Sequence, residues 1–431
     1  MKHTIFVICP SIRDRVELSK LSTKDNYHIL FHDYKVDSFE RILANGVVDD
    51  FVATNPSQII DSLLLLARSN NVNGIVSTDD YPGSIYASIV GHYCNLVGAR
   101  PAALLQCQHK YNARLIQEKY VPHATPKFTL FNDLDSIQAA DGARFSYPVF
   151  VKPVKSYYSV GANKATNYQQ LQEMLRQALL PSHFLSHFNW FLKTFGGSEI
   201  DSCAVMVEEY LSGVQVTLEG YCYQGQIEIV GIVDSIMFPG TISFARFEYP
   251  SSLPQAVQNR MGEIALTIVK AMHLDNCMFN IEFMYNPETD KIGIIEINPR
   301  MAAQFADLYE KVDGFNTYQL MLDIALGKKP VIFRKKGNHA IAASCVLRTF
   351  ENKKVLQVPT QDQIAHFFRQ FPDARFYADV KPGMLLSDVL QDGKSYRYGL
   401  IHLGAQDKQD LLNRFEKAKK LLPFDLVSST H

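Results

Sequence analysis

A chain of 431 residues with 47% hydrophobic and 20% charged residues has the composition of a globular protein, and its length indicates roughly two to three domains. A net charge of −1 provides no extended basic surface for nucleic acid or an anionic membrane, and the apolar run at 62–67 is too short to span a bilayer. Seven cysteines without close pairs argue against a disulfide framework or a cysteine-based zinc site, and they favour a reducing, cytoplasmic location.

The N-terminal part of the chain alternates short apolar strands with helical stretches. The opening MKHTIFVICPS predicts a first strand rather than a signal sequence. Strand–helix alternation predicts a mainly parallel sheet with right-handed crossovers. The glycine fingerprints of dinucleotide-binding folds and phosphate loops are absent, so a nucleotide would have to be held in another way. The expected strands are 5–9, 28–31, 50–52 and 72–77, and the expected helices are 59–69 and 83–93.

From about residue 126 the pattern changes to strands with an intervening helix, which is typical of an α+β arrangement. The last hundred residues or so end in a helix whose expected N-cap is Asp407, followed by an apolar stripe that includes Leu411 and Ala418. The expected strands are 128–130, 149–152, 204–209, 215–222 and 226–234, with a helix at 168–178.

The most informative segment is NIEFMYNPETDKIGIIEINPR at 280–300, in which two strands flank a turn. If the hairpin is centred on Thr289, Glu282 lies opposite Glu296, with Cβ atoms roughly 5 Å apart. Alternation places Asn298 on the same face as Glu296, with Ile295 and Ile297 pointing into the core. Two opposed carboxylates suit Mg²⁺ shared with substrate phosphates. The alternative is a hairpin whose solvent face happens to be acidic.

Four segments in a consistent order resemble the ATP-grasp superfamily. The strand IIEINPR, with Glu282 before it, resembles the metal-binding end of these proteins. Upstream, MVEEYLSG at 206–213 resembles the hinge strand that meets adenine, and YPVFVKP at 147–153 resembles the strand ending in a phosphate-binding lysine. Residues 97–128 resemble the helix that provides the first nucleotide-binding lysine.

The resemblance implies a site for Mg²⁺ and ATP, with Mn²⁺ as an alternative ion. Phosphoryl transfer needs positioning and charge neutralisation more than covalent chemistry from the protein. Arg300 is the expected catalytic residue, since it would stabilise an acyl phosphate as it forms. The expected metal ligands are Glu282, Glu296 and Asn298, and the expected ATP-binding residues are Lys110, Lys152, Ser159, Gly161, Glu208, Glu209, Tyr210, Leu211 and Gln215.

Three departures from the family pattern stand out. The loop after Lys152 has one glycine, Gly161, where the family usually has several. A glutamine, Gln215, occupies a position where a glutamate is usual, so it can bond a ribose hydroxyl but brings no charge to a metal. Gln304 stands where biotin carboxylases have a catalytic glutamate, which argues against a carboxylase.

The acceptor-substrate side is expected in the segment 231–254 and in the loop after Arg300. An amine or the two charged ends of an amino acid would be held there by polar side chains. An ordinary loop charge is the alternative for Asp234, Arg246 and Glu248. The candidates are Asp234, Arg246, Glu248 and Gln304, and the aromatic residues Phe238, Phe244, Phe247 and Tyr249 either wall a pocket or pack in the core.

These observations together predict a multidomain α/β and α+β protein. An N-terminal parallel α/β domain of the pre-ATP-grasp type is expected at 1–109, and an ATP-grasp fold of two subdomains at 110–330. Its small subdomain would cover about 125–205 and its large subdomain about 206–330. An α+β domain is expected at 331–431, similar to the C-terminal domain of biotin-carboxylase-type members.

The function implied is an ATP-dependent carboxylate–amine ligase, similar to L-amino-acid ligases, that releases ADP and phosphate. A biotin-carboxylase-like carboxylase and a catalytically silent nucleotide-binding module stay open as alternatives. The expected partners are a small carboxylate and a small amine, without nucleic acid or membrane, and the resemblance allows a homodimer.

Overall fold

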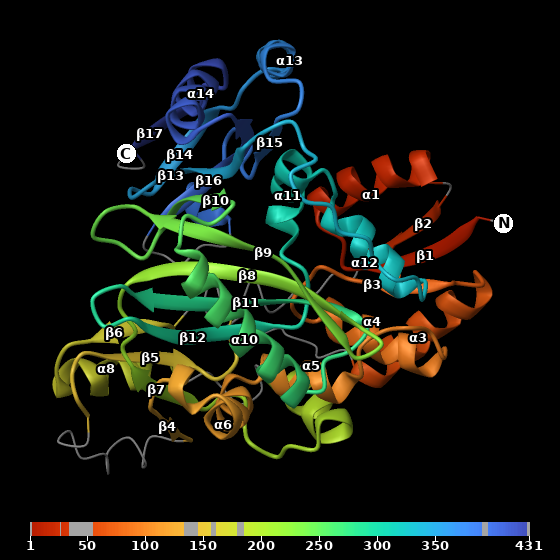
Figure 1. Ribbon diagram of the computed structural model, residues 1–431, viewed down its shortest axis with the longest axis vertical. Helices are drawn as coiled ribbons and strands as arrows, with labels where there is room; N and C mark the ends of the chain where they lie inside the picture. The colour runs from red at the N-terminus through yellow and green to blue at the C-terminus, as the bar shows by residue number, and fades with distance from the viewer. Residues whose placement is uncertain are drawn as a thin grey trace.

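The structure is a computed structural model that describes residues 2–25, 27–33, 55–132, 145–156, 161–178, 185–389 and 395–428. Within these residues the strands form a parallel N-terminal sheet, a small antiparallel sheet, a large antiparallel sheet and a separate strand pair. Figure 1 shows the N-terminal elements on one side of the large sheet and the small sheet along another edge.

The N-terminal layer is the parallel sheet β2-β1-β3 with helices around it, which confirms the predicted strand–helix alternation. Helix α3 begins at Pro56 because the Asn55 side chain accepts a hydrogen bond from the backbone N–H of Ser57. The strand expected at 50–52 lies outside the described residues. The elements are β1 (His3–Ile8), α1 (Ile12–Asp25), β2 (Tyr27–His32), α3 (Pro56–Ser69), β3 (Gly74–Val76), α4 (Gly83–Tyr93), α5 (Pro101–Gln108) and α6 (Lys110–Tyr120).

The small sheet has the order β4-β7-β5-β6 and is antiparallel throughout. Helix α8 covers it with Leu171 and Leu175, both fully buried against Val151 and Val207. Because β7 pairs with both β4 and β5, this unit extends beyond residue 205, where the small subdomain was expected to end. The elements are β4 (Phe128–Phe131), β5 (Val149–Pro153), β6 (Asn163–Ala165), α8 (Tyr168–Ala178), α9 (Ser186–Phe191) and β7 (Val205–Glu209).

The large sheet has eight strands in the order β12-β11-β8-β9-β10-β13-β16-β15. Its strands β13, β15 and β16 come from the region after residue 331, so the sheet continues across the expected domain boundary. The strands are β8 (Val214–Tyr223), β9 (Gln226–Met237), β10 (Phe244–Tyr249), β11 (Cys277–Asn286), β12 (Lys291–Asn298), β13 (Ile341–Thr349), β15 (Arg375–Ala378) and β16 (Tyr396–Ala405).

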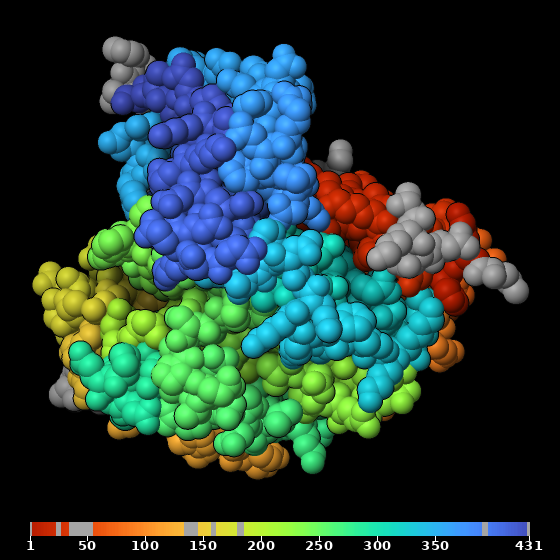
Figure 2. All heavy atoms as spheres, turned by 45° about the horizontal axis from the view of Figure 1, so that its top comes forward, coloured from red at the N-terminus to blue at the C-terminus, as the bar shows by residue number. Residues whose placement is uncertain are grey.

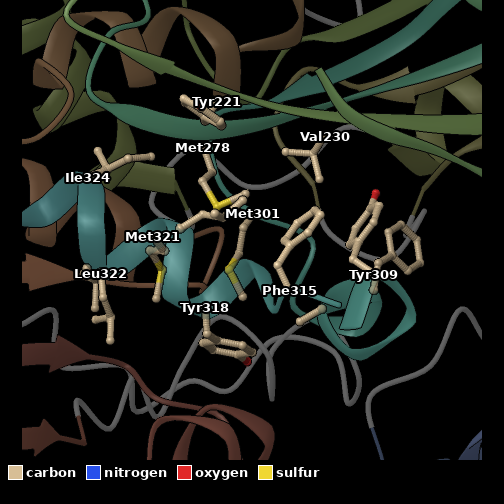
Figure 3. Packing of buried hydrophobic residues seen from close by; sticks show 14 of the residues in the cluster. Tyr221, Val230, Met278, Met301, Tyr309, Phe315, Tyr318, Met321, Leu322 and Ile324 are labelled. Atoms are coloured by element: carbon tan, nitrogen blue, oxygen red, sulfur yellow. The ribbon is translucent and has the colours of Figure 1, made fainter. Parts of the chain in front are cut away.

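The two faces of the large sheet are covered by different helices. On one face, α11 (Ala306–Asp313) and α12 (Thr317–Ala325) pack Tyr309 and Tyr318 into a cluster with Tyr221 and Met278 of the sheet. Figure 3 shows this cluster, which also includes residues of β1 and β3. On the other face, α10 (Gln255–Ala271) packs against β8, β11 and β12. The first cluster therefore fixes the N-terminal layer against the large sheet.

The C-terminal region forms a lobe that protrudes from the rest of the molecule (Figure 2). Asp407 caps its last helix, because its side chain accepts from the backbone N–H of Asp410, and this confirms the prediction. Among the described residues, no helix combines the length and hydropathy needed to cross a membrane. The remaining elements are β14 (Lys353–Gln357), α13 (Gln361–Gln370), α14 (Lys408–Leu421) and β17 (Asp425–Ser428).

Candidate functional site

The predicted carboxylate pair exists: Glu282 of β11 and Glu296 of β12 are directly opposed. Towards the turn the register shifts by one residue, and Phe283 pairs with Ile294. Ile295 is therefore the extra residue of a β-bulge, and its expected inward orientation is wrong. Ile294 and Ile297 pack in the core, whereas Ile295 is only half-buried.

The bulge makes the Ile295 carbonyl available to side chains from outside the sheet. It accepts a hydrogen bond from Arg114 Nη2 at 2.7 Å and one from Lys152 Nζ at 3.3 Å. Arg114 comes from α6 and Lys152 from β5, so both elements are held against the edge strand β12. Figure 1 shows the small sheet lying along this edge.

The two opposed carboxylates differ in their preference for a proton. Burial and, to a lesser extent, the neighbouring charge of Glu296 together raise the pKa of Glu282 to about 8. Burial also opposes ionisation of Glu296, but Lys110 and Lys152 outweigh it and hold the pKa of Glu296 below its usual value. The pair thus carries less than two full negative charges near neutral pH, and a cation beside it would favour loss of the proton from Glu282.

Hydrogen bonds orient the groups beside this pair. The Arg300 carbonyl can only accept, so Asn280 presents its Nδ2 there at 2.9 Å and its Oδ1 to Asn298 Nδ2 at 3.0 Å. This leaves the Oδ1 of Asn298 as an acceptor on the same face as Glu296. Two carboxylates and an amide oxygen are hard ligands that fit Mg²⁺. Among the described residues, no cluster of three or more His, Cys, Asp or Glu side chains offers a metal site of another kind.

Gln215 also takes part in this arrangement, although in a different way from the predicted ribose contact. It lies two residues from Thr217, which pairs with Glu282, and its Nε2 donates to Glu282 Oε2 at 2.8 Å. Its amide therefore orients a predicted metal ligand.

The predicted phosphate-binding lysines meet at the same place. Lys110 Nζ lies 3.5 Å from Glu296 Oε2, and Lys152 Nζ lies 2.8 Å from Glu208 Oε2. Glu208 is 5% exposed and also binds Arg114 Nε at 2.6 Å. Glu208 is therefore not a surface charge at a sheet edge, and β7 is an interior strand of the small sheet. Glu208 instead positions Arg114 and Lys152.

Arg300 reaches the N-terminal layer. Its Nε lies 3.2 Å from Asp80 Oδ1, and Lys155 Nζ lies 3.3 Å from Asp80 Oδ2. Burial would raise the pKa of Asp80, but Lys155 and Arg300 outweigh it and lower that pKa to about 2. Asp80 is thus ionised and holds Arg300 in place.

The remaining residues of the predicted ATP-binding set lie around the hinge. Leu211 packs on Gly293 of the hairpin, where an added Cβ would come within 2.6 Å of Leu211 Cδ2. Lys164 Nζ lies 4.1 Å from the centre of the Tyr210 ring, and Glu209 is exposed at the end of β7. Gly161 has a positive φ of 73°, as a turn glycine requires. Ser159 lies outside the described residues.

Three predicted substrate residues are not brought to this site. Strand pairing places Asp234, Arg246 and Glu248 on the face of the large sheet opposite to Glu282. The carboxylate of Asp234 accepts hydrogen bonds from the serines at 251 and 252. Glu248 forms ion pairs with Arg246 and with Lys408 of α14. These charges are satisfied within the fold. Phe247 lies on the site face instead, with its ring centre 5.1 Å from that of Phe305.

Sequence reasoning missed Arg114, Asp80 and Lys155. Arg114 follows Lys110 by four residues in α6 and therefore shares its helix face, a spacing visible in the sequence. Asp80 precedes the cis peptide bond between Tyr81 and Pro82, and no local pattern connects it with Arg300.

We expect ATP binding to weaken as pH rises above about 8, because burial, Arg114 and Lys110 together lower the pKa of Lys152 to about 8 despite Glu208. Only the protonated amine attracts phosphate, so the Kd for ATP should rise by up to about tenfold per pH unit. Calorimetric titration from pH 7 to pH 10 measures this. Lys152→Arg is the control, since a guanidinium stays charged in this range and should flatten the profile. The same profile in both proteins would contradict the assignment.

Comparison with known proteins agrees with this geometry. A family model described as an ATP-grasp domain matches residues 145–307, which include both members of the carboxylate pair. Over 245 residues the chain is 22% identical to the carbamoyl phosphate synthase large chain of Thermotoga petrophila, covering 54% of this chain and 20% of that protein. Over 204 residues it is 24% identical to the D-alanine–D-alanine ligase of Acetivibrio thermocellus, covering 44% of this chain and 48% of that ligase.

The chain thus spans less than half of either curated relative. Among solved structures, the L-amino acid ligase from Bacillus licheniformis superposes with a TM-score of 0.72 at 13% identity, over 98% of both chains. At that identity the likeness concerns the fold, and it includes the N-terminal and C-terminal regions outside the family match. From the family match, the shared fold and the opposed carboxylates, we conclude that this chain contains an ATP-grasp domain.

Proposed function

We propose that the protein is an ATP-dependent ligase that activates a carboxylate as an acyl phosphate and joins it to an amine, such as an amino acid. The observation that supports this most directly is the opposed pair of Glu282 and Glu296, flanked by the free amide oxygen of Asn298 and by Lys110 and Lys152. Oxygen ligands next to buried cations suit a metal–triphosphate complex.

In this proposal the carboxylate and amide side chains bind the metal ion, and the cationic side chains bind the phosphates and the substrate carboxylate. Glu282, Glu296 and Asn298 would hold Mg²⁺, which supplies charge neutralisation on the phosphate oxygens when bound. Lys110 and Lys152 neutralise further phosphate charge, and Arg114 and Glu208 keep Lys152 in place. Arg300, fixed by Asp80, places a guanidinium beside the carboxylate being phosphorylated.

The names of two similar proteins, a D-alanine–D-alanine ligase and an L-amino acid ligase, are compatible with a carboxylate–amine ligase. Gln304 has no ionisable carboxyl group, so a bicarbonate-dependent carboxylase would lack a base at that position. Phe247 lies on the same face of the large sheet as Glu282, and its half-buried ring has its centre 4.8 Å from that of Phe244.

The test is phosphate release from ATP in the presence of Mg²⁺ across a panel of amino acids and small carboxylates, with mass spectrometry of the products. We expect phosphate release that depends on both a carboxylate and an amine, with formation of an amide. ADP formed without an amide would contradict the ligase. Stimulation by bicarbonate and biotin would favour the carboxylase, and tight ATP binding without turnover on any pair would favour a silent module.

A further inference from the structure

A buried chain of hydrogen bonds connects Gln304, in the loop after Arg300, with the C-terminal strands. Gln304 Nε2 lies 2.9 Å from Ser344 Oγ, and Ser344 Oγ lies 2.9 Å from His402 Nε2. His402 Nδ1 lies 2.6 Å from Asp307 Oδ1, and Lys311 Nζ lies 3.0 Å from the other oxygen of Asp307. The four residues from Ser344 to Lys311 are buried, whereas Gln304 is half-exposed.

The hydrogen bonds from Ser344 to His402 and from His402 to Asp307 resemble the Ser–His–Asp triad of a hydrolase. Burial of Ser344 excludes a role for its hydroxyl as a nucleophile. Ser344 and His402 are both 0% exposed, so no acyl group can reach the hydroxyl. The chain of hydrogen bonds reaches solvent at Gln304. We therefore consider how these hydrogen bonds fix the position and orientation of the Gln304 amide.

Donor and acceptor rules determine the direction of every bond in this chain. Asp307 pairs with Lys311, and its carboxylate can only accept, so His402 must carry a proton on Nδ1. In a neutral imidazole Nε2 is then an acceptor, and the Ser344 hydroxyl must donate to it. Ser344 Oγ can then only accept from Gln304, which turns the Nε2 of the amide inward and its Oε1 outward.

The surroundings of His402 favour the neutral ring. Burial lowers its pKa, and Arg13 of α1 and Lys311 of α11 act in the same direction, whereas Asp307 alone opposes them. Arg375, opposite His402 on β15, is ion-paired with Glu17, and the Tyr377 ring packs edge-on against the imidazole. A protonated ring would donate from both nitrogens, release the Ser344 hydroxyl and allow the Gln304 amide to turn over.

The outward oxygen of Gln304 lies on the site side of the fold. Strand pairing places Ser344, Phe247 and Gln215 on the same face of the large sheet as Glu282. Gln304 itself follows Arg300 by four residues. Among the described residues its Oε1 has no hydrogen-bond partner, and it is not one of the buried polar atoms left unsatisfied, so it is open to solvent.

We propose that Gln304 Oε1 accepts a hydrogen bond from the nitrogen of the amine substrate, and that Ser344, His402 and Asp307 hold it in this orientation. This rests on the proposed ligase function and assigns one residue, Gln304, to the binding of its amine substrate. A neutral amide oxygen can hold an amine without stabilising its ammonium form as strongly as a carboxylate would. The nitrogen lone pair needed for attack on the acyl phosphate is then easier to expose.

The kinetic test is Gln304→Met, which keeps the length of the side chain and removes both polar atoms. Loss of one hydrogen bond to an amine should raise the KM for the amine about tenfold, with the KM values for ATP and the carboxylate unchanged. Gln370→Met, at the exposed end of α13, is the matched control. An unchanged amine KM in a protein that retains ligase activity would overturn the proposal while leaving the ligase function standing.

A second test does not depend on activity. In protein labelled with ¹⁵N-histidine, two-bond nitrogen–proton spectra should show His402 as the neutral Nδ1–H form, identified by the signal that changes in Ser344→Ala. In Gln304→Glu the introduced carboxylate cannot donate to Ser344, so the hydroxyl must turn towards it and the pKa of His402 should rise. An Nε2–H tautomer in the unaltered protein, or an unchanged pKa of His402 in Gln304→Glu, would refute the proposal that Ser344, His402 and Asp307 orient the Gln304 amide. If no amine supports phosphate release, the ligase function fails while the tautomer result is still decided.

Discussion

Replacing Glu296 with glutamine should lower Mg²⁺-dependent phosphate release by about 10²–10³-fold, with the fold intact. The substitution keeps the shape of the side chain but removes one of the two opposed charges that would hold the ion. It also removes the partner of Lys110, whose Nζ lies 3.5 Å from Glu296. Rates measured over a range of Mg²⁺ concentrations should show that the loss is partly recovered at high Mg²⁺.

The control for this variant is Glu288→Gln in the turn of the same hairpin, where the side chain is exposed. It changes net charge by the same amount on the same hairpin and should leave the rate within about twofold, as surface substitutions usually do. Circular dichroism of both variants separates misfolding from loss of metal binding. If Glu296→Gln retained the parent rate and the parent Mg²⁺ dependence, the metal site would be wrongly placed and the ligase proposal would lose its main support.

Replacing Arg114 with methionine should destabilise the protein by about 3–5 kcal/mol, because it leaves a buried carboxylate with half of its ion pairing. Arg114 is 2% exposed and binds both Glu208, at 2.6 Å, and the bulge carbonyl of Ile295. Glu208 would keep only Lys152 as a partner, and the pKa of Glu208, now held low chiefly by Arg114, should rise. Urea unfolding followed by circular dichroism measures the change in free energy.

The double substitution Arg114→Met with Glu208→Gln is informative, because it removes both charges of the pair. It should be less destabilising than the sum of the single substitutions, with a coupling energy of about 1–3 kcal/mol. Lys119→Met, at the exposed end of the same helix, should cost less than about 0.5 kcal/mol. Strict additivity of the two single effects would show that Arg114 and Glu208 do not act as a pair.

The proposed metal ligands could be identified from the sequence because they lie on one hairpin. Glu282 and Glu296 are separated by a short turn, and a turn centred on Thr289 is enough to predict that they oppose each other. The β-bulge at Ile295 could not be found in this way. Its carbonyl bonds to Arg114 and Lys152, more than a hundred residues earlier in the chain, and strand alternation carries no signal of such contacts.

The predicted substrate residues could not be placed correctly from the sequence. Asp234, Arg246 and Glu248 lie in a segment of the expected type, yet strand pairing turns all three to the far face of the sheet. Gln304 was identified by its position after Arg300, but its orientation depends on Ser344, His402 and Asp307. Two of these come from strands in the C-terminal region, and only packing brings them to the loop.

Local patterns in the amino-acid sequence therefore specified part of the strands and helices and the acidic hairpin, since each depends on residues near one another in the chain, and the family resemblance indicated Lys110 and Lys152. Long-range packing decided which charges meet: Asp80 with Arg300, Arg114 with Glu208, and His402 with Asp307. The physical reason is that a buried charge is stable only beside a partner, and that partner is selected by the contacts between layers rather than by neighbours in sequence.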